Sequence, residues 1–306
     1  MMKKDTLYLH VGWSKTGTSA IQAQLQTQKE EFREKGILYP QALQWPDHSH
    51  HMFALSFKEN SVYKSGLTPD EALQKLEEEI KDSDGQDVVL SSELSPIYFN
   101  NNKFKNFSRD YFSQVKIIFT VRPQSELLLS LFNQLVKDQN VRYGGSLFTL
   151  AMRNLVWLNF FQNIKQWARH VDISNMFVVP YSKVVVSDFF SIFNVAPSLE
   201  KTPKIVNPSL PSRCLPALQA HGRHAKGVKD FVRVRDAIVD LAQHMPAEDD
   251  RHVLFSDSEQ RALDDHFKRS NIQLAETFGF NQDLIHKSSY KDIMAISPDV
   301  NLSGTV

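Results

Sequence analysis

Residues 7 to 19 read Leu7-Tyr8-Leu9-His10-Val11-Gly12-Trp13-Ser14-Lys15-Thr16-Gly17-Thr18-Ser19. The first five residues form a mostly apolar run, which predicts a short buried strand, and the two glycines favour a tight turn after it. Ile21, Leu25 and Phe32 follow at roughly helical spacing and predict a helix. The stretch therefore predicts a strand, a glycine-containing loop and a helix in direct succession.

The rest of the chain continues this alternation of strands and helices. Apolar runs at 88–90, 115–121 and 176–179 predict three further buried strands. Capping boxes at Thr68 and Ser256, each with a glutamate three residues later, predict helices that begin there. This alternation predicts an α/β fold with a P-loop-like parallel sheet, helices on both faces and a mostly helical C-terminal part. We expect a single domain over residues 1–306, with its core at about 6–193 and the helical part at about 194–295.

Composition limits the classes of protein to which the chain can belong. Of its 306 residues, 42% are hydrophobic, which is enough for a large core, and 35 basic residues balance 35 acidic ones. A neutral chain gives no electrostatic reason to expect nucleic acid as a partner. Cys214 is the single cysteine, which excludes an intrachain disulfide. No apolar run is long enough for a secretory signal or a membrane span, so we expect a cytoplasmic protein without an integral membrane segment.

The loop between the first strand and its helix has the parts of an anion site. Gly12 and Gly17 allow backbone N–H groups to approach an anion closely, and the start of the helix attracts negative charge. In a Walker A motif the lysine directly follows the second glycine, whereas Lys15 precedes Gly17 by two residues. We therefore predict a phosphate or sulfate site of another kind, formed by Lys15, Thr16, Gly17, Thr18 and Ser19.

A second anion site is predicted at the end of the strand at 115–121. Arg122 follows this strand directly, and Ser130 lies eight residues further on, inside a leucine-rich helix. An arginine at the carboxyl end of a parallel strand lies at the edge of the sheet where α/β folds bind ligands. A serine two turns into the next helix can face the same point, and we predict that the two residues bind one phosphate.

Both segments resemble the PAPS-dependent sulfotransferase superfamily, and its bacterial carbohydrate sulfotransferases in particular. The pattern H-x-G-x-x-K-T-G-T-S at 10–19 resembles the loop that binds the 5'-phosphosulfate of 3'-phosphoadenosine 5'-phosphosulfate (PAPS) in that family. Residues 122–134 resemble its R-x-P-x-x-x-x-x-S-x-Y-x-Q string, but no residue separates Arg122 from Pro123 and Phe132 replaces the tyrosine. The separations of Arg122 from Ser130 and from Gln134 remain. The resemblance implies that Arg122 and Ser130 bind the 3'-phosphate, and it makes Gln134 a candidate contact for the acceptor.

The resemblance also implies a reaction. A sulfuryl group would pass from PAPS to the hydroxyl of a small-molecule or glycan acceptor, with a carbohydrate or glycolipid expected, and no metal would be required. 3'-phosphoadenosine 5'-phosphate (PAP) would be the second product. In-line displacement at sulfur needs a cation at the leaving phosphate, for which Lys15 is the candidate, and a base at the acceptor hydroxyl. The string at 204–210 resembles a loop that closes over the 3'-phosphate in relatives, and it adds Lys204 and the nearby Arg213 as candidates.

Two groups compete for the role of base. Glu93 follows the strand at 88–90, at the position where cytosolic sulfotransferases carry a catalytic histidine. His51 lies with His48 and His50 in a polar segment after the first helix, and a histidine is a competent base at neutral pH. His50 is also a candidate contact for the acceptor. Zinc binding by these histidines would leave only Asp47 as a nearby fourth ligand, so we expect no metal site.

Two other functions share parts of this pattern. A P-loop-type nucleotide kinase would use the same succession of strand, loop and helix, but it needs a Walker lysine and a carboxylate for magnesium. A non-catalytic relative that binds a nucleotide or a glycan would keep the fold and bind without turnover. The predicted site for a 3'-phosphate favours PAPS over ATP. The sequence indicates neither the identity of the acceptor nor an oligomeric state.

Overall fold

The computed structural model describes residues 3–58, 61, 63–198, 209–246 and 250–285. The chain divides into two compact units, one of residues 1–122 and 159–209 and the other of residues 123–158 and 210–306. The boundary between Arg122 and Pro123 falls directly after the strand predicted at 115–121. The expectation of a single domain stays a prediction. Within the described residues, no helix is both long enough and apolar enough to cross a membrane.

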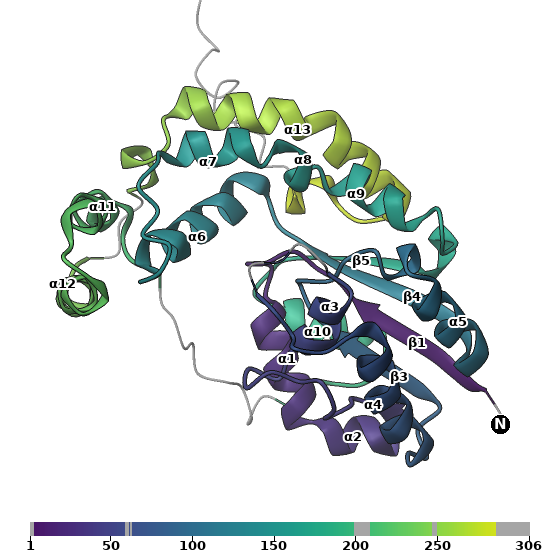
Figure 1. Ribbon diagram of the computed structural model, residues 1–306. Helices are drawn as coiled ribbons and strands as arrows, with labels where there is room; N and C mark the ends of the chain where they lie inside the picture. Colours follow the sequence, from purple (N-terminus) through teal and green to yellow (C-terminus); the bar gives the residue numbers. More distant parts are fainter. Residues whose placement is uncertain (1–2, 59–60, 62, 199–208, 247–249, 286–306) are drawn as a thin grey trace, which may run out of the picture. The chain divides into compact units, whose positions relative to one another are not determined.

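A five-stranded sheet forms the centre of the first unit (Figure 1). Its strand order is β2-β3-β1-β4-β5, and every pair of neighbours is parallel. The strands are β1 (Lys4–His10), β2 (Ile37–Leu38), β3 (Asp87–Ser91), β4 (Phe112–Val121) and β5 (Met176–Pro180). The four strands expected from apolar runs are confirmed, whereas β2 has only two residues and leaves no periodic signal.

Helices cover both faces of this sheet, as predicted. They are α1 (Thr18–Thr27), α2 (Lys29–Glu34), α3 (His51–Ser56), α4 (Pro69–Lys81), α5 (Asn102–Tyr111), α9 (Phe160–Trp167) and α10 (Val185–Ser191), with 3-10 turns η1 (Tyr98–Asn100) and η2 (Ile173–Asn175). On one face, Tyr8 and Ile118 belong to an apolar cluster to which α1, α2 and α10 contribute. On the other face, the ring centroid of Phe119 lies 6.2 Å from that of Trp167 in α9. The predicted α/β fold is therefore confirmed.

The alternation of side chains along the strands sets the position of three polar residues. Tyr8 and Ile118 face the α1 side of the sheet, so His10 and Thr120, each two residues further along its strand, face the same side. Ser91 is the register partner of His10 in β3. All three side chains are at most 1% exposed. Buried polar groups therefore lie at the carboxyl edge of the sheet, on the face that α1 covers.

The second unit is helical. It contains α6 (Gln124–Lys137), α7 (Leu147–Arg153), α8 (Leu155–Leu158), α11 (Leu215–His224), α12 (Val228–Gln243) and α13 (Asp257–Phe278), with η4 (Ser212–Cys214), η5 (Arg251–Val253) and η6 (Gln282–Leu284). The capping boxes predicted at Thr68 and Ser256 both form, and the helix from Ser256 ends at Gly279. α6 packs against α7, α11 and α13. The side-chain amides of Gln124 and Asn271 bond reciprocally, each at 2.9 Å, and join α6 to α13.

Candidate functional site

The first turn of α1 presents backbone N–H groups at the carboxyl edge of the sheet. Gly17 is the N-cap of this helix with φ 90, and no side chain caps it. A Cβ atom added at Gly17 would lie 2.9 Å from Cγ1 of Val185, so a larger residue would be both strained and crowded. The first N–H groups of a helix have no partner within it, and together with the helix dipole they favour a bound anion.

Lys15 adds a positive charge to the same loop. Its φ is 70, a left-handed conformation that non-glycine residues adopt rarely. Burial lowers the pKa of its ammonium group below the usual 10.5, while neighbouring Glu93 raises this pKa and neighbouring Arg122 lowers it. A partly desolvated cation beside a second cation gains from an anion that both can contact.

Arg122 joins this loop from the end of β4. Its Nη1 donates a hydrogen bond of 3.3 Å to the carbonyl oxygen of Lys15. Its guanidinium group lies 4.4 Å from the ring centroid of Tyr181, which follows β5 directly. The backbone N–H of Tyr181 donates to the carbonyl oxygen of Val121 at 2.7 Å, and this bond holds the ring beside the arginine. The ends of β1, β4 and β5 thus bring together the two cations that the sequence assigned to separate anion sites.

Gly12 permits a close approach between this loop and β4. A Cβ atom added to it would lie 1.9 Å from Oγ1 of Thr120. We expect Gly12→Ala to lower the free energy of unfolding by about 1–3 kcal/mol, the usual cost of overpacking, as measured by urea denaturation. Gly144→Ala is the matched control, because its nearest new contact would be 3.4 Å away. Equal stability of Gly12→Ala and the wild type would contradict the steric argument.

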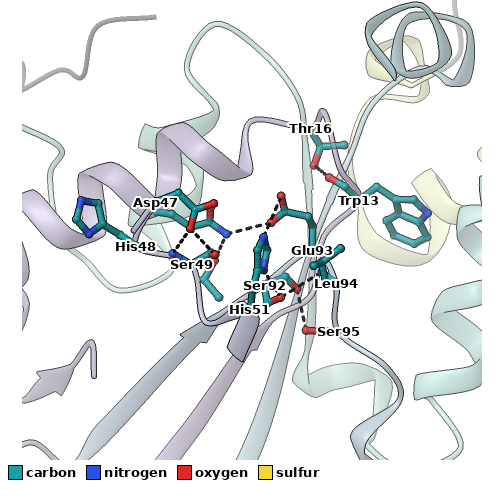
Figure 2. A network of polar contacts seen from close by, with 12 residues as sticks. Trp13, Thr16, Asp47, His48, Ser49, His51, Ser92, Glu93, Leu94 and Ser95 are labelled. Atoms are coloured by element: carbon teal, nitrogen blue, oxygen red, sulfur yellow. Dashed lines mark hydrogen bonds and ion pairs between the residues drawn. The ribbon is translucent and has the colours of Figure 1, made fainter. Parts of the chain in front are cut away.

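Glu93 and His51 form an acid–base pair beside the loop. His51 begins α3, Glu93 lies two residues beyond β3, and Nε2 of the histidine is 3.7 Å from Oε1 of the glutamate. The two side chains are 6% and 15% exposed, so both are largely withdrawn from water. Figure 2 shows them pointing toward one another. The two candidates that compete for the role of base in the sequence are therefore neighbours in the structure.

The surroundings of His51 decide which of the two can meet an acceptor. Its Nδ1 is hydrogen-bonded to Oγ of Ser92 at 2.7 Å, and its Nε2 faces Glu93. Burial lowers the pKa of its imidazole below 6.5, while Glu93 and Asp47 oppose this shift, so the ring is neutral at pH 7. Nδ1 is committed to Ser92 and Nε2 faces Oε1 of Glu93 at 3.7 Å, whereas a carboxylate has several acceptor positions. Glu93 therefore retains the lone pairs that an acceptor hydroxyl needs.

His50 is buried, with 1% of its surface exposed. Its Nδ1 accepts from the N–H of Ser91 at 3.1 Å, and its Nε2 donates to the carbonyl oxygen of Pro40 at 2.9 Å. Its own N–H donates to the carbonyl oxygen of Ser91 at 2.7 Å. These bonds join the start of α3 to the end of β3 and so position His51 beside Glu93. A contact of His50 with the acceptor stays a prediction, and its ring nitrogens are already engaged.

Comparison with known proteins adds little to this geometry. No protein-family model matches the chain, and no curated protein matches it. Among solved structures, the chain is similar to the sulfotransferase domain of the olefin synthase from Synechococcus PCC 7002, with 14% sequence identity and a TM-score of 0.36. The match covers 78% of this chain and 96% of that domain. A likeness this distant leaves the function to be argued from the site itself.

The remaining predicted residues take different positions. Thr16 is 0% exposed, and its hydroxyl bonds to Thr120 and to the carbonyl oxygen of Trp13, so only its backbone can face an anion. Thr18 is buried and Ser19 exposed in the first turn of α1. Ser130 and Gln134 belong to α6 in the second unit, and their binding roles stay predictions. Lys204 lies outside the described residues, and Arg213 belongs to the second unit.

Two other features of the described residues bear on the site. No group of three or more histidine, cysteine, aspartate or glutamate side chains that could hold a metal ion occurs among them. A cavity of about 310 Å³ lies at the amino-terminal ends of β4 and β5, lined by residues that include Phe99, Arg109 and His170. This is the opposite edge of the sheet from Lys15, so the cavity does not form part of the candidate site.

Proposed function

We propose that the protein is a sulfotransferase that transfers a sulfuryl group from PAPS to an acceptor hydroxyl on a carbohydrate or glycolipid. The observation that carries this proposal is the meeting of Lys15, Arg122 and the uncapped first turn of α1, with Glu93 beside them. Two cations and a set of backbone donors fit a ligand with several anionic groups. The cytoplasmic location expected from the sequence is kept as part of this proposal.

The residues present fit PAPS as a donor. The first turn of α1 and Lys15 would hold the 5'-phosphosulfate, and Arg122 would hold the 3'-phosphate, for which the sequence also predicts Ser130. PAPS supplies a sulfuryl group on a good leaving group, and the protein has to neutralise the charge that develops on the departing phosphate. The Lys15 ammonium is suited to this role, because burial removes part of its solvation.

The chain must also take a proton from the acceptor. The acceptor oxygen forms a bond to sulfur, the bond between sulfur and the bridging phosphate oxygen breaks, and the acceptor proton passes to Oε1 of Glu93. His51, neutral before the reaction and 3.7 Å from this oxygen, stabilises the carboxylate that must accept the proton. Glu93 is the proposed base because its side chain is the more exposed of the two, while Nδ1 of His51 is bonded to Ser92 and its Nε2 faces the carboxylate.

Calorimetric titration with PAP tests the cofactor assignment. We expect wild-type protein to prefer PAP to adenosine 5'-phosphate, which lacks the 3'-phosphate, and to prefer both to ATP with magnesium. Arg122→Ala and Lys15→Ala should each weaken PAP binding by about 10- to 100-fold, the usual effect of losing a hydrogen bond to a charged group. Arg109→Ala, an exposed arginine at the other end of β4, is the control and should bind PAP as the wild type does.

The outcomes separate the candidate functions. Preference for ATP with magnesium would favour the kinase. Equal PAP affinity of the wild type and both variants would contradict the sulfotransferase proposal. Tight PAP binding without release of PAP from PAPS would favour a non-catalytic relative. The transfer assay uses a panel of monosaccharides, oligosaccharides, a glycolipid and p-nitrophenol, so that a non-carbohydrate acceptor is also detected.

A further inference from the structure

A buried chain of hydrogen bonds links the anion-binding loop to Glu93. It runs from the carbonyl oxygen of Trp13 through five side chains, those of Thr16, Thr120, His10, Ser91 and Gln22. Each of these five side chains is at most 1% exposed. The last amide nitrogen, Nε2 of Gln22, lies 3.1 Å from Oε2 of Glu93. None of these five side chains is required to contact the donor or the acceptor in the proposed reaction.

The two ends of the chain determine the direction of every bond in it. A carbonyl oxygen can only accept, so Thr16 donates its hydroxyl proton to Trp13. The hydroxyl of Thr120, 2.6 Å away, must then donate to Thr16. Thr120 in turn accepts from Nε2 of His10, at 3.4 Å. The direction of these bonds requires a His10 ring that carries its proton on Nε2.

The other half of the chain follows from the same ring. Nδ1 of His10 is then a bare acceptor, and it takes the hydroxyl proton of Ser91 at 2.8 Å. Burial lowers the pKa of the His10 imidazole to about 3, which keeps this nitrogen unprotonated. Oγ of Ser91 accepts from Nε2 of Gln22 at 3.2 Å. The second hydrogen on that nitrogen is donated to Oε2 of Glu93.

Gln22 is therefore the only member of the chain that touches the proposed base, and it uses both of its N–H bonds. One is committed to Ser91, so the amide cannot rotate away from Glu93 without leaving a buried hydroxyl short of a donor. Oε2 of Glu93 is thereby held, and Oε1 stays on the side of His51. A leucine at 22 would fill the space but release the carboxylate, and a glutamate would place a second acceptor against it.

We propose that Gln22 is a positioning residue, which fixes the orientation of Glu93 through the hydrogen-bond chain that ends at the carbonyl oxygen of Trp13 in the anion-binding loop. This inference rests on the proposed function, because it assigns Gln22 a role in the reaction that Glu93 is proposed to assist. The role of Gln22 concerns the geometry of one carboxylate. Binding of the donor is still the task of Lys15 and Arg122.

The kinetic test compares Gln22→Leu and Gln22→Glu with Gln26→Leu. Gln26 lies one turn further along α1, and its hydrogen bonds go to Gln41 and Gln44. We expect Gln22→Leu to lower kcat for PAP release from PAPS by about 10- to 100-fold, the effect of a misplaced catalytic group. Its KM for PAPS and its PAP affinity should stay within about twofold.

Gln22→Glu should lower kcat further, and Gln26→Leu should match the wild type. A wild-type kcat in Gln22→Leu would overturn the proposal. A loss of kcat that Gln26→Leu shares, or one accompanied by an equal loss of PAP affinity, would also overturn it, since it would show a general effect of changes in α1.

A measurement on the wild type tests the direction of these hydrogen bonds without any variant. Nitrogen-15 NMR of the histidine rings should find His10 neutral, with its proton on Nε2, from pH 5 to 8. A proton on Nδ1 would reverse the bond to Ser91 and overturn the inference. If the wild type neither binds PAP nor consumes PAPS, the proposed function fails, and the NMR result still decides whether the hydrogen bonds run in the inferred direction.

Discussion

Exchange of Glu93 for glutamine is expected to lower kcat for sulfuryl transfer by about 10²- to 10⁴-fold, the usual contribution of a general base. The amide keeps the shape of the side chain and can still accept from Gln22, but it cannot take a proton at neutral pH. PAP affinity should change by less than about threefold, because Glu93 faces the acceptor in the proposed reaction. Initial rates of PAP release, together with calorimetry on the same preparation, measure both quantities.

The variant His51→Gln distinguishes between the two candidates for the role of base, Glu93 and His51. Because Nδ1 of His51 is bonded to Ser92 and its Nε2 faces Glu93, His51 acts through Glu93, and we expect its loss to lower kcat by only about tenfold. For Glu93→Gln the matched control is Glu30→Gln, which replaces an exposed carboxylate in α2. A larger loss in His51→Gln than in Glu93→Gln would make the histidine the base and the glutamate its partner.

The parts of the site that the sequence predicts are those encoded by local patterns. The succession of β1, loop and α1 depends on an apolar run and two glycines within thirteen residues, and Arg122 follows the clearest apolar run in the chain. Parallel strands end at one edge of a sheet, so these two features had to lie near one another once the strand order was known. The hydrogen bond from Arg122 to the carbonyl oxygen of Lys15 directly links these two features.

The pairing of Glu93 with His51 was not predictable in this way. It depends on the docking of α3 against the end of β3, through backbone and ring bonds between His50 and Ser91. Nothing in the spacing of the histidines carries that information, and a polar segment rich in histidine reads as an exposed loop. Burial of His50 and His51 reverses that interpretation, because both rings take part in the packing at the edge of the sheet.

Gln22 and Tyr181 were missed for a similar reason. A glutamine inside a helix has no distinctive sequence signal, although Gln22 lies one turn after Thr18, on the buried face of α1. Tyr181 directly follows a strand, as Arg122 does, and that shared position was the available signal. Aromatic side chains occur throughout the core of this protein, so a tyrosine alone indicates packing more often than ligand binding.

Acid is expected to destabilise the fold. We expect the free energy of unfolding to fall by about 4 kcal/mol between pH 7.5 and pH 5 through His10 and His50 together, with a slope that approaches about 1.4 kcal/mol per pH unit for each histidine only below pH 6.5. Burial lowers the pKa of His10 to about 3 and that of His50 to about 4, whereas both titrate near 6.5 in the unfolded chain. Urea denaturation at steps of half a pH unit measures the slope.

The sign follows from the protons bound in each state. Below pH 6.5 both rings are protonated in the unfolded chain. In the folded protein they stay neutral until the pH approaches their lowered pKa values, so acid favours unfolding. His51 adds to the same trend, since burial lowers its pKa as well. Well above pH 7.5 the rings are neutral in both states and contribute no slope.

His50→Gln should remove about 1 kcal/mol per pH unit from the slope between pH 6.5 and 5, even though loss of its bonds to Pro40 and Ser91 lowers stability at every pH. His266→Gln, at an exposed position of α13, should leave the slope as it is in the wild type. A slope that His50→Gln does not change would mean that this ring takes up its proton in the folded protein. Because a protonated ring has no acceptor nitrogen, His50 would then lose the bond from the N–H of Ser91, and with it part of the link that holds His51 beside Glu93.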